Sequence, residues 1–212
     1  MTLKSYLSIG IFIFQKFIDK CRRLSAKYWS LYNRGCLLYY KVEFNPARTE
    51  MLGKHIFALS RKSDIIIGDG LRSLSGKQYS LDYSNESKIH VHEGALLIIG
   101  KHVAMTNVTL QCYSKITIGD YVNIGANTMI IDTDFHSLDW KDRRDGSDIT
   151  KKKNLPITIG DDVFIGAKSI ILKGVTIGPK SIVGAGSVVS HNIPEGEVWA
   201  GNPARFIKKV PE

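Results

Sequence analysis

The sequence lacks the features of disulfide-stapled, zinc-binding and membrane-spanning proteins. Only three cysteines occur in 212 residues, Cys21, Cys36 and Cys112, and their number and spacing fit neither disulfide pairs nor a metal site. The apolar run from Tyr6 to Phe14 has nine residues, far fewer than the roughly 20 that cross a bilayer. No small-residue cleavage site follows this run, so a cleaved secretion signal is not expected. These absences predict a protein of the reducing cytoplasm.

Acidic residues are scarce near the N-terminus. Residues 1–60 hold ten Lys and Arg against three Asp and Glu, a balance of +7, whereas the remaining 152 residues hold nineteen against seventeen, a balance of +2. The positive excess therefore belongs to the N-terminal segment. No recognised nucleic-acid-binding motif accompanies this charge, so we expect no nucleic-acid partner.

The N-terminal segment, residues 1–60, has the pattern of a basic amphipathic helix. At helical spacing, one stripe carries Phe14, Phe17, Ile18, Cys21 and Leu24, and it is opposed by Lys16, Lys20, Arg22, Arg23 and Lys27. An apolar stripe beside a basic face is typical of a helix that lies on an anionic membrane surface. A helical cap over the open end of a stacked fold has the same pattern. Both interpretations remain open at this point.

Aliphatic residues recur with a strict period of six in the C-terminal half. One run is Ile159, Ile165, Ile171, Ile177, Val183 and Val189, and an earlier run is Ile118, Ile124 and Ile130. Neither an α-helix nor a simple two-faced strand has a period of six. Repeats of this length are typical of solenoids, in which each repeat is one unit of a stacked coil.

Each repeat predicts a short strand followed by a tight corner, and three such sides close a triangular coil of about 18 residues, with coils roughly 4.8 Å apart. We expect the solenoid to occupy residues 61–212, with less regular coils over 61–117. The rhythm ends near Asn192, which leaves a tail at 193–212. It also breaks before Ile157, where the charged stretch 137–156 predicts a loop outside the coil.

The repeats read ITIGDYVNIGANTMI and ITIGDDVFIGAKSIILKGVTIGPKSIVGAGSVV, followed by VWAGNPARFIKK. These runs resemble the hexapeptide-repeat acyltransferases, in particular the sugar O-acetyltransferases similar to galactoside and maltose acetyltransferases and those of surface-polysaccharide gene clusters. The resemblance extends from Ile89 to Lys209. It implies an all-β solenoid, a left-handed parallel β-helix. It also implies a homotrimer with active sites between subunits, and acetyl-CoA as the acyl donor.

His136 is the expected catalytic base, and it stands in DTDFHSLDW at the start of the predicted loop. Acetyl transfer from a thioester to an alcohol requires removal of the hydroxyl proton, and imidazole, with an ordinary pKa of about 6.5, suits that task. A carboxylate on the other ring nitrogen would fix the tautomer, and Asp134 and Asp132 are both candidates. The resemblance supports this role, because related enzymes carry a histidine motif at the start of the same loop. The alternatives are a metal ligand and a solvated histidine. No metal is expected, because one short motif supplies too few ligands.

The resemblance also implies binding residues. Ala167 and Ala185 would contact the pantetheine arm, Ser190 and His191 the nucleotide end, Arg205 a phosphate, and Phe164 the acceptor or the arm. Asn107 and Trp140 are the expected acceptor-binding residues. Met105 and Tyr113 occupy neighbouring positions of the family pattern.

The expected function is acetyl-CoA-dependent O-acetylation of a sugar hydroxyl in a surface polysaccharide or its precursor, in the cytoplasm or at the inner face of the membrane. The alternative is N-acetylation of an amino-sugar nucleotide. A metal hydratase or a non-catalytic scaffold on the same solenoid is a third interpretation. The sequence separation of the His90/His92 pair, His102 and His136 does not favour a three-histidine metal site.

Overall fold

A computed structural model describes residues 3–80 and 86–211 of the chain and, within the first helix, the side chains of residues 14–21 and 23–39. The side chains of the apolar run before Phe14, and that of Arg22, lie outside the described residues. The helices are α1 (Leu3–Tyr39), α2 (Trp140–Asp145), α3 (Asp148–Lys151) and the short 3₁₀ helix η1 (Lys77–Tyr79). Everything else that is regular is β-strand.

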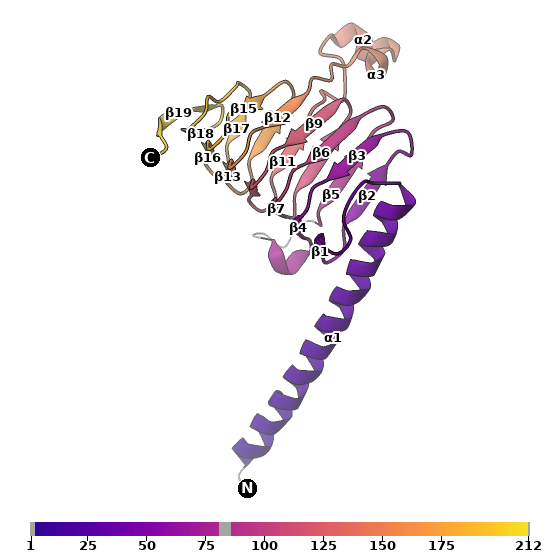
Figure 1. The fold of residues 1–212 in the computed structure, drawn as a ribbon, viewed down its shortest axis with the longest axis vertical. Coiled ribbons are helices and arrows are strands. Elements are labelled where there is room, and N and C mark those ends of the chain that lie inside the picture. The colour runs from indigo at the N-terminus through magenta and orange to yellow at the C-terminus, as the bar shows by residue number, and fades with distance from the viewer. Residues whose placement is uncertain (1–2, 81–85, 212) are drawn as a thin grey trace.

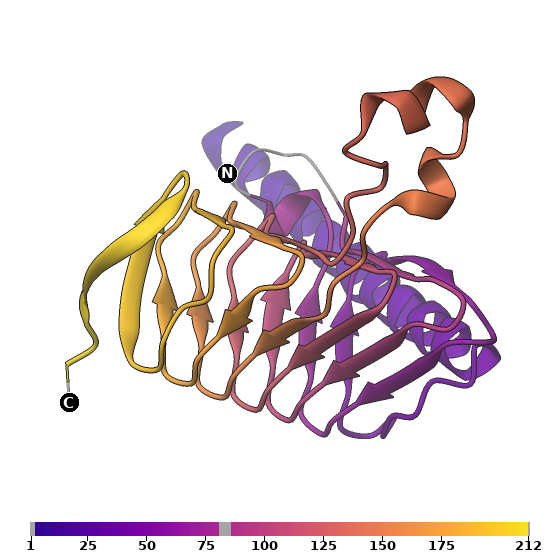
Figure 2. The ribbon, with the colours of Figure 1, turned by 90° about the horizontal axis from the view of Figure 1, so that it is seen from above.

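The strands form three sheets that the chain visits in turn, as the six-residue rhythm predicts. Sheet 1 holds β1 (Glu50–Leu52), β4 (Arg72–Leu74), β7 (Ala104–Thr106), β10 (Asn123–Ile124), β13 (Phe164–Ile165), β16 (Ile182–Val183), β18 (Glu197–Gly201) and β19 (Ala204–Lys209). Sheet 2 holds β2 (Ile56–Leu59), β5 (Lys88–Val91), β8 (Thr109–Cys112), β11 (Met129–Ile131), β14 (Ile170–Leu172) and β17 (Val188–Val189). Sheet 3 holds β3 (Asp64–Ile67), β6 (Leu96–Ile99), β9 (Lys115–Ile118), β12 (Ile157–Ile159) and β15 (Thr176–Ile177). Figure 2 shows the resulting stack of coils.

The aliphatic residues of the rhythm stack in columns inside the prism. In sheet 1, Met105, Ile124, Ile165 and Val183 occupy equivalent places on successive parallel strands, and each is at most 3% exposed. The isoleucines and valines at six-residue spacing from 118 to 130 and from 159 to 189 are all buried in the same core. The predicted parallel β-helix of triangular section, with an N-terminal helix and a protruding loop, is therefore confirmed.

The coils begin before the expected boundary at residue 61, and strand pairing continues past Asn192, where the six-residue rhythm ends. Strands β1 and β2 pair with β4 and β5, so coils begin before residue 61, in a stretch without a six-residue rhythm. At the other end, β18 pairs in parallel with β16, and β19 then turns back to pair antiparallel with β18. The repeat therefore continues past Asn192, and the last strand of the tail closes the stack as a hairpin. The end at Asn192 was wrong because Val198 and Trp199 continue the strand pairing without the repeat's glycines.

Helix α1 is attached to the first coil through its C-terminal turns. Leu37 is buried in the core, and Asn33 is fully buried against strand β1 and its following corner. The Asn33 amide donates to the backbone oxygens of Met51 and Gly53 and contacts His55 Nδ1, and His55 Nε2 lies 2.7 Å from Ser73 Oγ. The remaining turns extend away from the body (Figure 1). In the part of the chain that the structure describes, no helix is long and apolar enough to cross a membrane.

The predicted loop is an excursion between β11 and β12 that carries α2 and α3. It stands off the body on the side opposite to α1 (Figure 1). Two hydrogen bonds fix its base, from Leu155 N to Asp132 O at 2.9 Å and from Asp134 N to Lys153 O at 3.0 Å. The two short helices within it were not expected from the sequence.

Candidate active site

His136 lies at the corner where the chain leaves sheet 2 for sheet 3. The turn before it is set by Phe135, which has a φ of 61° and whose N–H donates to Thr133 Oγ1 at 3.1 Å. The side chain of His136 is 61% exposed. The imidazole is therefore presented outside the coil, on a backbone fixed by the base of the excursion.

The orienting partner of His136 is Asp148, in the first turn of α3. The two side chains meet at 2.5 Å between His136 Nδ1 and Asp148 Oδ2, and the carboxylate side chain is only 12% exposed. A carboxylate on Nδ1 leaves Nε2 as the proton acceptor. Nε2 makes no hydrogen bond to any of the described residues. The pair has the geometry of a general base and its orienting carboxylate.

The excursion is braced so that Asp148 stays in place. Asp142 of α2 accepts from Ser137 Oγ at 2.7 Å and from Lys151 Nζ of α3 at 2.6 Å. The hydrogen bonds from Lys151 and Ser137 lower the pKa of the Asp142 carboxyl below its ordinary value. Asp139 caps α2 by accepting from Lys141 N at 2.9 Å. These contacts connect the two short helices without any buried side chain in α2.

Neither of the two carboxylates expected beside His136 is its partner. Asp132 is fully buried and accepts three backbone N–H groups, from Tyr113, Ser114 and Lys115, at 2.7 to 2.9 Å. Burial nevertheless raises the pKa of its carboxyl, and these hydrogen bonds oppose the rise. Asp132 therefore fastens its corner to the preceding coil and does not orient the base.

Asp134 is also engaged elsewhere. Its Oδ1 pairs with Lys173 Nζ at 2.7 Å, at the corner of the following coil. Both side chains are largely shielded, at 15% and 22% exposure. The expectation that Asp134 or Asp132 orients His136 was wrong, because each ties the excursion to one neighbouring coil.

A column of rings borders His136 on the same corner. Tyr113 stacks on His92 with 4.9 Å between ring centroids, and Phe135 meets Tyr113 edge-on at 5.8 Å. Lys152 Nζ lies 4.2 Å from the centroid of the Tyr113 ring. His90 joins the column at 5.2 Å from Tyr113. The 4.9 Å separation equals the spacing of coils, so the column follows the repeat along this corner of the prism.

The expected coenzyme-binding residues divide between two edges of the prism. Ser190 and His191 follow β17 at the same kind of corner as His136, and Ser190 Oγ lies 3.0 Å from His191 Nδ1. Ala167 and Ala185 lie at the corner between sheets 1 and 2. There the coils touch closely, since a Cβ on Gly166 would lie 2.4 Å from Ala185 N. One chain therefore does not bring both groups to His136.

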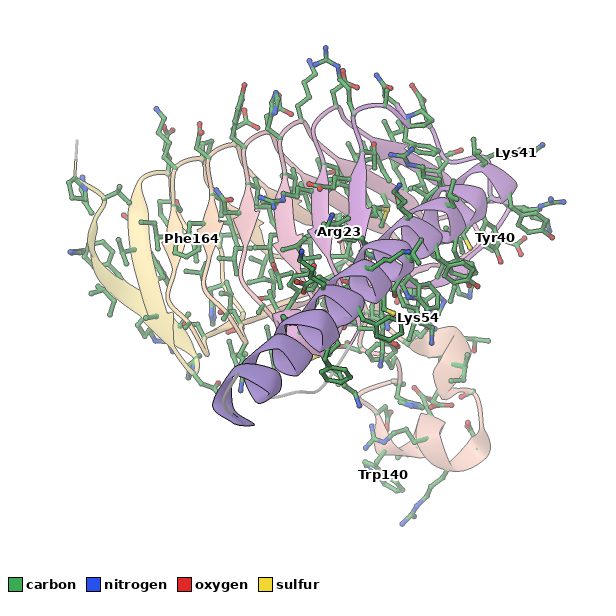
Figure 3. All side chains as sticks on the ribbon, turned by 90° about the horizontal axis from the view of Figure 1, so that it is seen from below. Arg23, Tyr40, Lys41, Lys54, Trp140 and Phe164 are labelled. Carbon is green, nitrogen blue, oxygen red and sulfur yellow. The ribbon has the colours of Figure 1, made fainter. Side chains whose placement is uncertain are left out.

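Phe164 and Arg205 lie on a third region, sheet 1. Phe164 is 48% exposed and lines a shallow groove of about 200 Å³ with Leu74, Thr106 and Asn123 among its walls. Arg205 is exposed on β19. Trp140 is 53% exposed at the start of α2, against Arg144 at 4.6 Å, well separated from Phe164 (Figure 3).

Asn107 is not available to an acceptor. It is 1% exposed, its Oδ1 accepts from Gly76 N at 2.8 Å, and its Nδ2 donates to Gly76 O at 3.1 Å. The amide holds the segment that contains η1 against the corner. Its expected role in acceptor binding was wrong, since a buried polar group with both partners in place has no reason to face a ligand.

The sequence did not single out Asp148. Four aspartates occur in the excursion between residues 139 and 148, and nothing in the sequence distinguishes the one that contacts His136. Only the turn at Gly146, with a φ of 78°, and the start of α3 bring one of them to His136. No three-residue cluster of His, Cys, Asp or Glu that suits a metal ion occurs among the residues the structure describes.

Comparison with known proteins shows what this fold is similar to. Residues 156–191 match the model described as the hexapeptide repeat of succinyl-transferase. The galactoside O-acetyltransferase of Escherichia coli is 36% identical over 126 residues, which are 59% of this chain and 60% of that protein. A 2,3,4,5-tetrahydropyridine-2,6-dicarboxylate N-acetyltransferase of Clostridium perfringens is 56% identical over 57 residues, 27% of this chain and 24% of that protein.

The solved structure of a hexapeptide-repeat-containing acetyltransferase from Vibrio cholerae superposes with a TM-score of 0.52 at 25% identity, over 91% of this chain and 93% of that one. The chain is thus similar to hexapeptide-repeat acetyltransferases and, over 59% to 60% of its length, to galactoside O-acetyltransferases. The match spans 51% to 63% of the length of three curated relatives.

Proposed function

We propose that the protein is an acetyl-CoA-dependent O-acetyltransferase that acts on a sugar hydroxyl of a surface polysaccharide or its precursor. The observation that carries this proposal is the His136–Asp148 pair, 2.5 Å apart at an exposed corner of a hexapeptide-repeat fold. The similarity to galactoside O-acetyltransferases supports a sugar as the acceptor. The three free cysteines and the proposed acetyl-CoA donor support a location in the cytoplasm.

The chemistry at this corner needs one base and no covalent enzyme intermediate. His136 Nε2 takes the proton of the acceptor hydroxyl as its oxygen attacks the thioester carbonyl. The tetrahedral intermediate then expels the thiolate of coenzyme A, and the imidazolium returns the proton to that sulfur. Asp148 holds the tautomer and stabilises the imidazolium between these steps. Cys112 takes no part, because burial raises the pKa of its thiol to about 12.

The division of the expected residues between separate edges supports a homotrimer. His136 lies on the edge between sheets 2 and 3, whereas Ala167 and Ala185 lie on the edge between sheets 1 and 2. When parallel prisms pack side by side, one edge of a protomer can face another edge of its neighbour. We propose that the acyl donor lies in such a groove. Sedimentation should then give a trimer at micromolar concentration, and a monomer would remove the shared site.

The residues present suit the long arm of acetyl-CoA. Ala167 is half-buried, Ala185 is exposed, and their coils touch closely at Gly166 and Ala185. Arg205 and the neighbouring Lys208 and Lys209 on the exposed β19 supply positive charge for phosphates. A structure of the Vibrio cholerae relative is a complex with acetyl-CoA. Isothermal titration with CoA should give binding that Arg205→Ala weakens.

Release of free thiol from acetyl-CoA tests the proposed function. The purified protein is assayed against free sugars, nucleotide sugars and lipid-linked glycans, and the product is identified by mass spectrometry. We expect an ester on a sugar hydroxyl. An amide on an amino sugar would instead support the N-acetyltransferase alternative. No turnover with any sugar, despite CoA binding, would contradict the proposal.

A further inference from the structure

Helix α1 carries a continuous apolar stripe that no other part of the described chain covers. At alternating spacings of three and four residues it presents Phe14 (63% exposed), Phe17 (62%), Leu24 (59%), Tyr28 (59%) and Leu31 (71%), with the exposed Cys21 between Phe17 and Leu24. At 1.5 Å per residue, residues 14–31 extend over about 26 Å. Monomeric proteins rarely expose a continuous apolar surface of this length.

The stripe faces away from the body. Asn33 and Leu37, the residues that fix α1 to the first coil, are buried. At 100° per residue they lie on the helix face roughly opposite to Leu24 and Leu31. Figure 3 shows α1 crossing outside the coils, with Arg23 on its free part. The helix can therefore be covered by an external surface without any change in the body.

The charge beside the stripe identifies that surface. Residues 3–39 hold seven Lys and Arg and one carboxylate, Asp19, a balance of +6. Lys20, Arg23 and Lys27 are exposed along one border of the stripe. Aromatic rings within the stripe, such as Phe17 and Tyr28, suit the boundary between headgroups and acyl chains. We propose that α1 lies on the surface of a membrane that contains anionic lipids, with this stripe against the acyl chains.

The spacing of the apolar residues also fits the contact line of a coiled coil with other copies of α1, here called the seam. The charges of the residues beside the seam do not fit a coiled coil. With Phe14 and Phe17 as the first two seam positions, the positions beside the seam hold Lys20, Lys27 and Arg34 on one side. The other side holds Ile18, Ser25 and Tyr32, so no carboxylate complements the cations. Coiled coils usually pair opposite charges there. A surface of negative charge supplies the missing complement along the whole helix.

Vesicle co-sedimentation of the full chain tests the proposal without relying on acetyl transfer. The probes are phosphatidylcholine vesicles with and without phosphatidylglycerol. We expect binding to the anionic vesicles that weakens with salt. Phe17→Asp with Leu24→Asp should weaken it by at least about tenfold, and Lys20→Gln with Lys27→Gln by about fivefold for each lysine. Ile207→Asp, on the equally exposed β19 side chain (57%), is the matched control and should bind like the native chain.

Sedimentation velocity of the same variants separates the outcomes. The Phe17/Leu24 variant should keep its association state and its turnover of a free sugar, because neither residue touches the catalytic corner. A variant that binds vesicles as the native chain does would overturn the proposal. So would a native chain that binds neither vesicle. A lower association state without loss of lipid binding would assign the stripe to self-association instead.

Discussion

The coils and the excursion at residues 132–156 are held together by different physics. In the coils, Ile130 and Ile171 are fully buried side by side on β11 and β14, and parallel strand pairing satisfies the backbone. In the excursion, α2 buries no side chain, and polar contacts from Asp132, Asp142 and Asp148 keep its shape. The coils therefore supply stability, while the excursion supplies a single geometry for His136.

The difference gives a physical reason for placing the proposed chemistry outside the repeat. A repeat position that must bury an aliphatic side chain cannot also carry a proton acceptor, because an unpaired buried polar group costs several kcal/mol. An excursion has no such demand on its side chains. Its carboxylates cost little when they remain partly solvated or paired. Changes in the two regions should accordingly affect different quantities, activity in one and folding in the other.

The largest effect is expected from His136, the proposed base. His136→Ala should lower kcat by about 10²- to 10⁴-fold, the usual contribution of a general base, with no loss of thermal stability. Thiol release under saturating acetyl-CoA measures it. His102→Ala is the control, since His102 stacks on Tyr121 at another corner and should leave kcat unchanged. A variant that keeps more than about a tenth of native kcat would remove His136 from its role.

In the coils, a substitution should lower the stability of the fold rather than kcat. Ile130→Ala removes a fully buried side chain from the core and should lower the free energy of unfolding by about 2 to 5 kcal/mol. Ile149→Ala, on the excursion at 54% exposure, should change it by no more than about 0.5 kcal/mol. Urea denaturation compares the two. Equal losses would mean that the excursion shares the core's stability, and the contrast drawn above would fail.

The junction of α1 with the coils should make stability depend on pH. Burial lowers the pKa of His55 to about 4 from an ordinary value of 6.5, so the unfolded chain binds the proton more tightly. The neutral, buried His55 therefore contributes fully to the free energy of unfolding above pH 6.5. This contribution is lost as the pH falls towards 4, by about 3 kcal/mol in all. Denaturation at several pH values measures it. His55→Gln should flatten the dependence, and an unchanged slope in that variant would assign it to other groups.

A smaller effect is expected from the orienting carboxylate. Asp148→Asn should lower kcat by about tenfold to a hundredfold, less than loss of the base, because the tautomer of His136 is no longer fixed. KM for the acceptor should stay the same, and Asp148→Glu should restore part of kcat. Asp145→Asn, in the same excursion, is the matched control. If KM rises while kcat is kept, Asp148 supports the loop and does not position the base.

The sequence was sufficient to predict the β-helix because the six-residue repeat occurs many times. Each isoleucine six residues after the last confirms the same coil, so single deviations do not hide the pattern. The ends were predicted less well, since β1 and β18 continue the pairing with residues such as Met51 and Trp199 that break the rhythm. Pairing with an existing strand edge, rather than local sequence, fixes those two strands.

The site was predicted only as far as chemistry is local. His136 could be proposed from its neighbours and its place at the break of the rhythm. Its partner could not, because Asp148 reaches it through a helix, a glycine turn and a second helix whose packing is polar. The same holds for Asn107. The family resemblance predicted that it binds the acceptor, but its amide is hydrogen-bonded to the backbone of Gly76 instead. Long-range polar contacts leave no periodic trace in a sequence.

The hairpin of β18 and β19 determines how the solenoid ends. An open β-helix rung offers a row of free backbone N–H and C=O groups on which another chain can continue the stack. Here the last strand runs in the reverse direction and carries Arg205, Lys208 and Lys209 along the outside. Charge and reversed polarity discourage such continuation, and α1 rests on the first coil at the other extremity. The molecule is thereby kept at a finite length and protected from growing into a fibre.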